Sequence, residues 1–269
     1  MFNDLDLFSG YMKIFGIPKI KPDCGPIPAL SGKRLGIING SSWITLWSYY
    51  FGRKILPGVK LINAGNEAVQ LNFIGAHERG ERCPPQINID LFAKYALDFI
   101  SLYPVDAILI TCSTMNRSFE TVKEAVKPYG IPVVQIDEPM MESSVLCGGK
   151  TLVIATHGPT VDSTQELLHN TAKKLGKPEP DFLGATIEDA FELLGSGDIE
   201  GHNKALAQCI SENREKHRID QVVLAQLSMS VLSVQYPDME KHFGIPVFTS
   251  GIEGFKYIRK IFEEGRPAK

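Results

Sequence analysis

The chain has 269 residues, of which 43% are hydrophobic and 22% charged, and its formal net charge is −3. These values predict a globular protein with a substantial core and exclude the disordered and fibrous classes. The charge shows no basic excess and no Lys/Arg run is interleaved with aromatic residues, so nucleic acid is not an expected partner. The acidic N-terminus and the lack of a stretch of roughly 20 apolar residues predict a cytoplasmic protein without a membrane partner.

Residues 1–33 are predicted to form an irregular N-terminal arm, because glycines and prolines interrupt every hydrophobic period. Its apolar side chains are expected to pack either on their own lobe or on a second subunit, and we expect a homodimer or higher homo-oligomer. Regular structure is predicted to begin with a strand at 34–39, a helix at 43–51 and a strand at 59–62. Residues 64–88 are predicted to form a loop of the length typical of lids, and 89–102 a helix.

The remaining chain alternates between predicted strands and helices. The expected strands are 105–111, 131–136, 151–155, 220–226 and 245–249. The expected helices are 116–128, one that opens at Asp137, one with a capping box from Ser163 to Glu166, 197–217 and 252–262. This alternation predicts an α/β fold with mostly parallel sheets flanked by helices.

The sequence repeats itself. Residues 105–115, VDAILITCSTM, align without a gap on residues 219–229, IDQVVLAQLSM, 114 positions later, and the same shift superposes GIPV at 130–133 on GIPV at 244–247. Two matches at one offset predict two pseudo-symmetric lobes. We expect lobe 1 over 34–149, completed by a C-terminal helix at 250–266, and lobe 2 over 150–249.

Small polar residues gather where four predicted strands end. Ligands bind beyond the carboxyl ends of the strands in parallel sheets, so these residues are candidates for a site. They are Asn39, Ser41, Ser42, Ser113, Thr114, Thr156, His157, Thr160, Gln226 and Ser228. Each alone is also typical of a turn or a helix cap, and their convergence favours a binding site.

Cys112 ends a predicted strand just before a helix. Backbone N–H groups in such a turn lower the pKa of a thiol or hold a carboxylate; the alternative is a small residue that packs the turn. The five cysteines are scattered and lack C-x-x-C spacing, so neither a disulfide framework nor a metal site is expected. For the other four, packing or solvent exposure is the default.

The TCSTMN turn at 111–116, the VLAQLSM turn at 223–229 and the two repeated halves resemble the aspartate/glutamate/hydantoin racemase superfamily, which includes maleate isomerase and arylmalonate decarboxylase. The resemblance covers about residues 34–265. It implies an active-site cleft between the lobes, where backbone amides and Ser, Thr and Asn side chains hold the substrate carboxylate. It also implies one cysteine from each lobe and no metal or organic cofactor. The implied ligands are Asn39, Ser41, Ser42, Ser113, Thr114, Thr156, Thr160 and Gln226.

The sequence departs from this pattern at the second cysteine. The first family cysteine falls on Cys112, whereas the second falls on Gln226, which is neither an acid nor a base. Either Ser228 or His157 carries the second proton, or the reaction needs a single proton carrier, or the protein only binds a small carboxylate.

We therefore predict a cofactor-independent racemase or isomerase-type enzyme. It acts on the carbon next to the carboxylate of a small amino acid or dicarboxylic acid, with Cys112 as base or nucleophile. The alternatives are a decarboxylase or lyase on the same scaffold, or a binding protein for small carboxylates.

Overall fold

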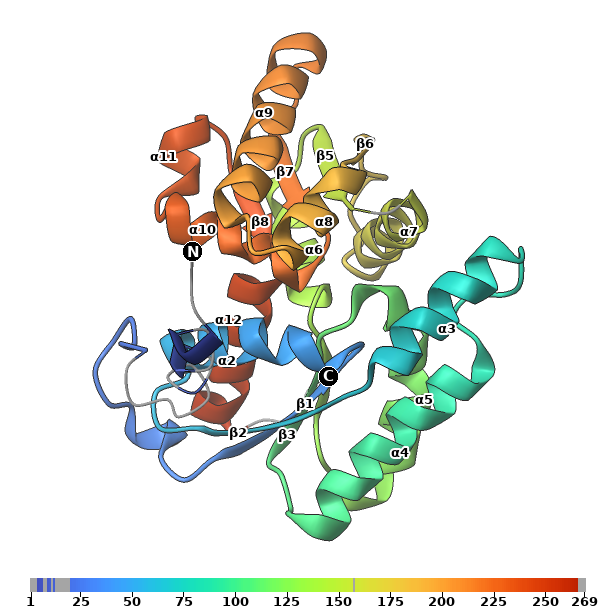
Figure 1. The fold of residues 1–269 in the computed structure, drawn as a ribbon, viewed down its shortest axis with the longest axis vertical. Coiled ribbons are helices and arrows are strands. Elements are labelled where there is room, and N and C mark those ends of the chain that lie inside the picture. The colour runs from blue at the N-terminus through green and yellow to red at the C-terminus, as the bar shows by residue number, and fades with distance from the viewer. Residues whose placement is uncertain (1–3, 7–8, 11, 13–19, 157, 266–269) are drawn as a thin grey trace. The chain divides into compact units, whose positions relative to one another are not determined.

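The computed structural model describes residues 4–6, 9–10, 12, 20–156 and 158–265 (Figure 1). The chain divides into two compact units. Unit 1 contains the described residues up to Thr111, Arg117–Val134 and those from Phe255 onward; unit 2 contains Cys112–Asn116 and Gln135–Gly254. The lobe limits expected at 34–149 and 150–249 stay a prediction.

Unit 1 is built on a parallel sheet with the strand order β2-β1-β3-β4. Its strands are β1 (Arg34–Asn39), β2 (Lys60–Gly65), β3 (Ala107–Ile110) and β4 (Val133–Gln135). Its helices are α2 (Thr45–Ile55), α3 (Glu67–Glu78), α4 (Gln86–Leu102) and α5 (Phe119–Val126), with short 3₁₀ turns η1 (Pro28–Leu30), η2 (Ser42–Ile44), η3 (Ser113–Ser118) and η4 (Lys127–Tyr129).

Two glycines show how helices cover both faces of this sheet. A Cβ on Gly36 of β1 would lie 2.7 Å from Cδ2 of Phe99, so α4 packs directly on that position. A Cβ on Gly52 of α2 would lie 2.5 Å from Cδ1 of Leu61 in β2 and 3.2 Å from Cε1 of Phe255 in α12 (Ser250–Glu264). Both glycines therefore permit close helix–sheet packing.

Unit 2 is built on a second parallel sheet with the strand order β6-β5-β7-β8. Its strands are β5 (Thr151–Ala155), β6 (Phe182–Thr186), β7 (Gln221–Leu224) and β8 (Val247–Thr249). Its other elements are α6 (Glu138–Cys147), α7 (Gly158–Lys174), α8 (Glu188–Gly195), α9 (Ile199–His217), η5 (Leu227–Val231), α10 (Leu232–Gln235), α11 (Met239–Phe243) and the first turn of α12.

Side chains of β5 alternate between two cores, as a strand with helices on both faces requires. Leu152 and Ile154 pack in a cluster that includes Leu206 of α9. Val153 and Ala155 point to the opposite face, where they pack with Val161 of α7. Polar side chains can therefore lie outside these two cores at the carboxyl end of the strand.

The two sheets share one strand order, in which the first strand of each set lies between the second and the third. This arrangement confirms the predicted α/β fold of two related halves with mostly parallel sheets. It also creates a topological switch point between β1 and β3 and another between β5 and β7.

The prediction of a loop over 64–88 is wrong, because α3 occupies Glu67–Glu78. Asn66 caps this helix through its Oδ1, which accepts from the N–H of Ala68 at 2.9 Å. Only Val69 and Ala76 are buried along α3, so its sequence lacks a marked apolar stripe.

Other elements also differ from the expected ones. Strand β6 was not predicted, since this strand at the end of the sheet is only partly buried and carries a glycine. Helix α7 begins at Gly158, ahead of the expected capping box at Ser163. Within the expected N-terminal arm, residues 4–6, 9–10 and 12 are helical, whereas residues 20–33 consist of bends, turns and the 3₁₀ turn η1, and the irregular arm stays a prediction.

The packing of α2 predicts that two glycine-to-alanine substitutions change the free energy of unfolding by different amounts. Gly52→Ala should lower the free energy of unfolding by about 1–3 kcal/mol, because the new methyl group overlaps Leu61. Gly195→Ala, at the end of α8 with open space around it, is the matched control and should change stability little. Urea denaturation of both variants tests this, and equal losses would contradict the packing described.

Candidate active site

Asn39 stands at the carboxyl end of β1 and is fully buried. Its Oδ1 accepts hydrogen bonds from Ser48 Oγ and from Thr111 Oγ1, both at 2.7 Å. Its Nδ2 donates to Asn63 Oδ1 at 3.0 Å. Because both ends of the amide are engaged, Asn39 ties together the ends of β1, β2 and β3.

Ser41 and Ser42 follow β1 in unit 1 and differ from each other. Ser41 is buried, and its Oγ has no hydrogen-bond partner among the described residues. Ser42 is exposed; its N–H donates to Glu67 Oε1 at 3.1 Å and its hydroxyl donates to the same oxygen. The Ser42 hydroxyl is the main reason that the pKa of Glu67 lies below its usual value. Ser42 thus holds the first turn of α3.

Cys112 follows β3 directly and belongs to unit 2, where it is partly exposed. Its Sγ lies 3.1 Å from Thr114 Oγ1, and its carbonyl accepts from the N–H of Met115 at 3.0 Å. The turn thus places a hydroxyl and backbone N–H groups beside the sulfur.

The pKa of Cys112 is raised, contrary to the expectation from its place in a turn. Desolvation is the largest cause, because an ionised sulfur in this partly closed position loses hydration. The Thr114 hydroxyl and the backbone N–H groups of Met115 and Thr114 do lower the pKa, but by less than burial raises it. The resting state of Cys112 at neutral pH is therefore the thiol.

A second group of polar residues lies where β4 ends. Gln135 Oε1 accepts from the N–H groups of Asp137 at 2.8 Å and Glu138 at 2.9 Å. Its Nε2 donates to Asp137 Oδ2 at 2.9 Å and also to Asn116 Oδ1. Gln135 therefore connects Asp137 to η3, the turn that follows Cys112.

The carboxyl group of Asp137 is buried, and burial raises its pKa to about 6. Ser113, Gln135, Ser250 and Asn116 lie close enough to favour its charge. Of these, Gln135 donates with hydrogen-bond geometry. Asp137 Oδ1, Ser113 Oγ, Asn116 Nδ2 and Ser250 Oγ are buried without a hydrogen-bond partner in the part of the chain that the structure describes.

In the second sheet, Gln226 links the ends of β5 and β7. Its Oε1 accepts from the N–H of Thr156 at 2.8 Å and from Thr156 Oγ1 at 2.9 Å. The amide NH₂ of this half-buried side chain makes no hydrogen bond to the described residues, so it is a donor open to a ligand. Gln226 occupies the position that the internal repeat pairs with Cys112.

The other predicted residues of unit 2 are Thr160, Ser228 and His157. Thr160 is buried in the first turn of α7, and its Oγ1 has no partner among the residues described. Ser228 is buried in η5, two residues after Gln226. His157 lies outside the described residues.

Unit 2 thus contains Cys112, Ser113, Thr114, Thr156, Thr160, Gln226 and Ser228, whereas Asn39, Ser41 and Ser42 belong to unit 1. Gln135, Asp137, Asn116 and Ser250 were not among the residues predicted from the sequence. Asp137 and Ser250 follow the outer strands β4 and β8, and this position at the carboxyl ends of two strands is the signal that marks them.

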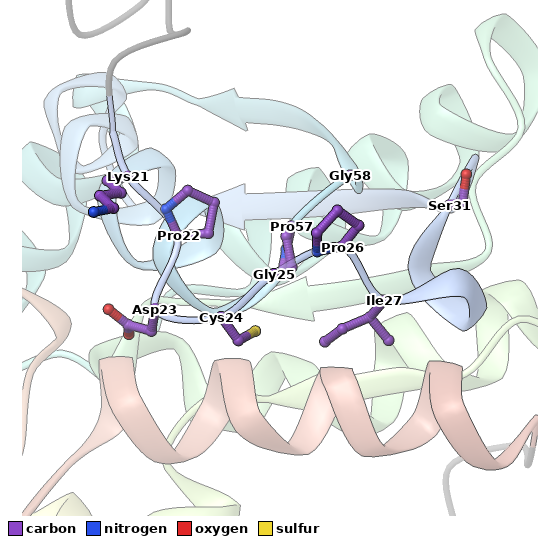
Figure 2. Close-up of a pocket in the computed structure, with 10 residues that line it drawn as sticks. All are labelled: Lys21, Pro22, Asp23, Cys24, Gly25, Pro26, Ile27, Ser31, Pro57 and Gly58. Carbon is purple, nitrogen blue, oxygen red and sulfur yellow. The ribbon is translucent and has the colours of Figure 1, made fainter.

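A separate pocket in unit 1 has a volume of about 590 Å³ and is lined by residues 21–27 with Ser31, Pro57 and Gly58 (Figure 2). Cys24 points towards α12, and Arg259 Nη1 donates to its Sγ at 3.4 Å. None of the predicted site residues lines this pocket.

Within the described ranges, no group of three or more His, Cys, Asp or Glu side chains is arranged to hold a metal ion. None of the described helices combines the length and the apolar composition that crossing a bilayer requires.

Fold and site define an α/β protein with polar groups at the carboxyl ends of two related parallel sheets. The Asp/Glu/hydantoin racemase family model matches residues 67–257, and the chain belongs to this family of racemases and isomerases. A comparison with curated protein sequences gives no match.

Solved structures share the fold. An aspartate racemase homologue from Pyrococcus horikoshii is 17% identical with a TM-score of 0.63, over 86% of this chain and 99% of the other. Allantoin racemase from Pseudomonas fluorescens is 17% identical with a TM-score of 0.58, over 88% and 93%. Maleate isomerase from Pseudomonas putida is 14% identical with a TM-score of 0.56, over 86% and 93%.

The raised pKa of Asp137 predicts how stability depends on pH. The folded-state pKa of about 6 exceeds the ordinary value of 3.8, so between these values the unfolded chain ionises while the folded chain stays protonated. Stability should therefore fall as pH rises from about 4 to about 6, by on the order of 3 kcal/mol from this group.

Asp137→Asn removes this titration. Relative to wild type, the variant should gain on the order of 3 kcal/mol of unfolding free energy between about pH 4 and about pH 7. Urea unfolding of both proteins across this range measures the difference, and parallel curves would refute the assignment.

Proposed function

We propose that the protein is a cofactor-independent enzyme of the racemase or isomerase type. Its substrate is a small amino acid or dicarboxylic acid, and the reaction takes place at the carbon next to a carboxylate. One observation carries this proposal: in a chain of the racemase family, a partly exposed Cys112 follows a strand at the carboxyl edge of a sheet, with Thr114 Oγ1 3.1 Å from its sulfur.

The reaction requires stabilisation of an enolate-like intermediate, because a proton next to a carboxylate is very weakly acidic. In unit 2 the candidate donors are the backbone N–H groups of the 113–115 turn, the Thr114 hydroxyl and the free amide NH₂ of Gln226. Thr156 positions Gln226 by donating twice to its carbonyl oxygen. Further proposed substrate contacts are Ser113 and Thr160 of unit 2 and Asn39, Ser41 and Ser42 of unit 1. Ser228 of unit 2 stays a proposed proton carrier.

Cys112 acts in this proposal through proton transfer. As a base, its thiolate removes the proton from the α-carbon, and the Thr114 hydroxyl stabilises the sulfur charge by donating to it. As an acid, its thiol returns a proton to the carbanion. The raised pKa favours the acid form in the free protein, so formation of the thiolate needs the bound substrate or a second base.

Decarboxylation or elimination is the second candidate, and Gln226 favours it. The position that the repeat pairs with Cys112 holds an amide with its oxygen bonded to Thr156, so no acid or base is present there. In a decarboxylation, the C–C bond breaks, CO₂ leaves, and the electron pair on carbon takes the proton of the Cys112 thiol. The thiolate then recovers a proton from water.

Substitution of Cys112 tests both candidates. The protein is incubated in heavy water with a panel of amino acids, malonates and maleate, and the reactions are followed by NMR. With at least one panel member, the wild type should exchange α-hydrogen for deuterium or release CO₂. Cys112→Ala should lower that rate at least about 10²-fold, and Cys112→Ser should retain only a trace, because an alkoxide forms far less readily than a thiolate.

The matched control is Cys147→Ala, which changes an exposed cysteine at the end of α6 and should leave the rate unchanged. An unchanged rate in Cys112→Ala would remove Cys112 from the mechanism. Binding of a panel member without exchange or product formation in the wild type would identify a carboxylate-binding protein instead. Formation of a product with inverted configuration at the α-carbon distinguishes racemisation from reactions that need only one proton transfer.

A further inference from the structure

Unit 2 contains a buried carboxylate that the proposed reaction does not use. Asp137 is 1% exposed, and it forms no ion pair with the described residues. Its Oδ2 accepts from Gln135, and its Oδ1 lies buried without a partner in the described part of the chain. A buried charge of this kind is costly and calls for a physical reason.

The surroundings of Asp137 connect it to the turn that carries Cys112. Ser113 and Asn116 of η3 both favour the ionised carboxyl group, and Asn116 Oδ1 accepts from Gln135 Nε2. Ser250, at the start of α12, approaches from the carboxyl end of β8. The carboxylate thus lies among η3, β4 and α12.

Asp137 also acts on the sulfur itself. Its negative charge is one of the causes that raise the pKa of Cys112, together with the larger effect of burial. The other charged side chains near these elements are Arg117, Glu138, Glu142 and Glu253. Arg117 donates to the carbonyl of Cys83, Glu138 pairs with Lys174 at 2.8 Å, and Glu253 accepts from Ser143 Oγ at 3.1 Å. Among the described residues, Asp137 is the charged group that contributes to the raised pKa of Cys112.

We propose that Asp137 is a positioning residue for Cys112. Through Gln135, which is hydrogen-bonded to both Asp137 and Asn116, it holds the turn at 113–116 that follows the sulfur. This inference rests on the function proposed above. The negative charge of Asp137 disfavours the Cys112 thiolate, so more of Cys112 stays in the thiol form that a protonation step requires.

The test is the pH profile of alkylation of Cys112 by iodoacetamide, followed on its own peptide by mass spectrometry, without any substrate. Thiolate is the reactive form, so the midpoint of the profile reports the ionisation of Cys112. Asp137→Asn should move the midpoint to lower pH and accelerate alkylation at about pH 8 by about threefold or more, with the plateau rate unchanged.

Two variants are the controls. Glu138→Gln removes a charge from the next residue, which pairs with Lys174, and should leave the midpoint in place. Ser250→Ala disturbs the packing beside Asp137 but keeps its charge, and should also leave it in place. An unmoved midpoint in Asp137→Asn overturns the inference. If Asp137→Asn and Ser250→Ala both lowered the midpoint and raised the plateau rate, the cause would be greater exposure of Cys112 to the reagent. That result would also overturn the inference.

The outcome is independent of the function proposed for the enzyme. If Cys112→Ala retained full activity but Asp137→Asn moved the midpoint, the proposed reaction would fail while the electrostatic link stood. If Cys112 proved essential and the midpoint did not move, only the role of Asp137 would be lost.

Discussion

Helices cover both faces of each parallel sheet, and this constraint decides where chemistry can lie. In β5, neighbouring side chains enter two different cores, so the strand has no face left for a polar group. Polar side chains gather where the strands end, at Asn39, Cys112, Asp137, Thr156, Gln226 and Ser250. The carboxyl edge is therefore both the structural boundary of the core and the place of the proposed site.

Two amides stabilise that edge in different ways. Asn39 is saturated by protein partners, so it holds three strand ends of unit 1 together. Gln226 uses only its carbonyl oxygen, for Thr156, and keeps its NH₂ available. Gln226, which the internal repeat pairs with Cys112, thus combines a structural bond with a free donor. In the proposed function, this combination suits recognition of a carboxylate and leaves proton transfer to other groups.

The electrostatics of Cys112 follow from a competition between burial and hydrogen bonding. Backbone N–H groups and Thr114 favour the thiolate, as a turn before a helix leads one to expect. Loss of hydration and the charge of Asp137 oppose it and prevail. Cys112 therefore rests as the thiol, and in the proposed reaction a substrate-dependent change is needed before it can remove a proton.

Much of the architecture could be predicted from the sequence, because buried strands and the repeat at one offset leave strong local patterns. The strand ending at Cys112 and the pairing of Cys112 with Gln226 follow from that repeat alone. Helix α3 could not be recognised, since it buries only two residues. Asp137 was not predicted because its raised pKa comes from burial, and its surroundings include η3 and Ser250, which are distant in sequence. The direction in which the pKa of Cys112 is shifted likewise depends on desolvation, which a sequence motif does not reveal.

The central claim is that Cys112 faces the bound substrate. Protection from alkylation measures this directly: a carboxylate that the protein turns over should slow iodoacetamide labelling of Cys112 by about tenfold or more at saturation, while labelling of exposed Cys147 stays the same. Equal labelling of Cys112 with and without that carboxylate would contradict the account.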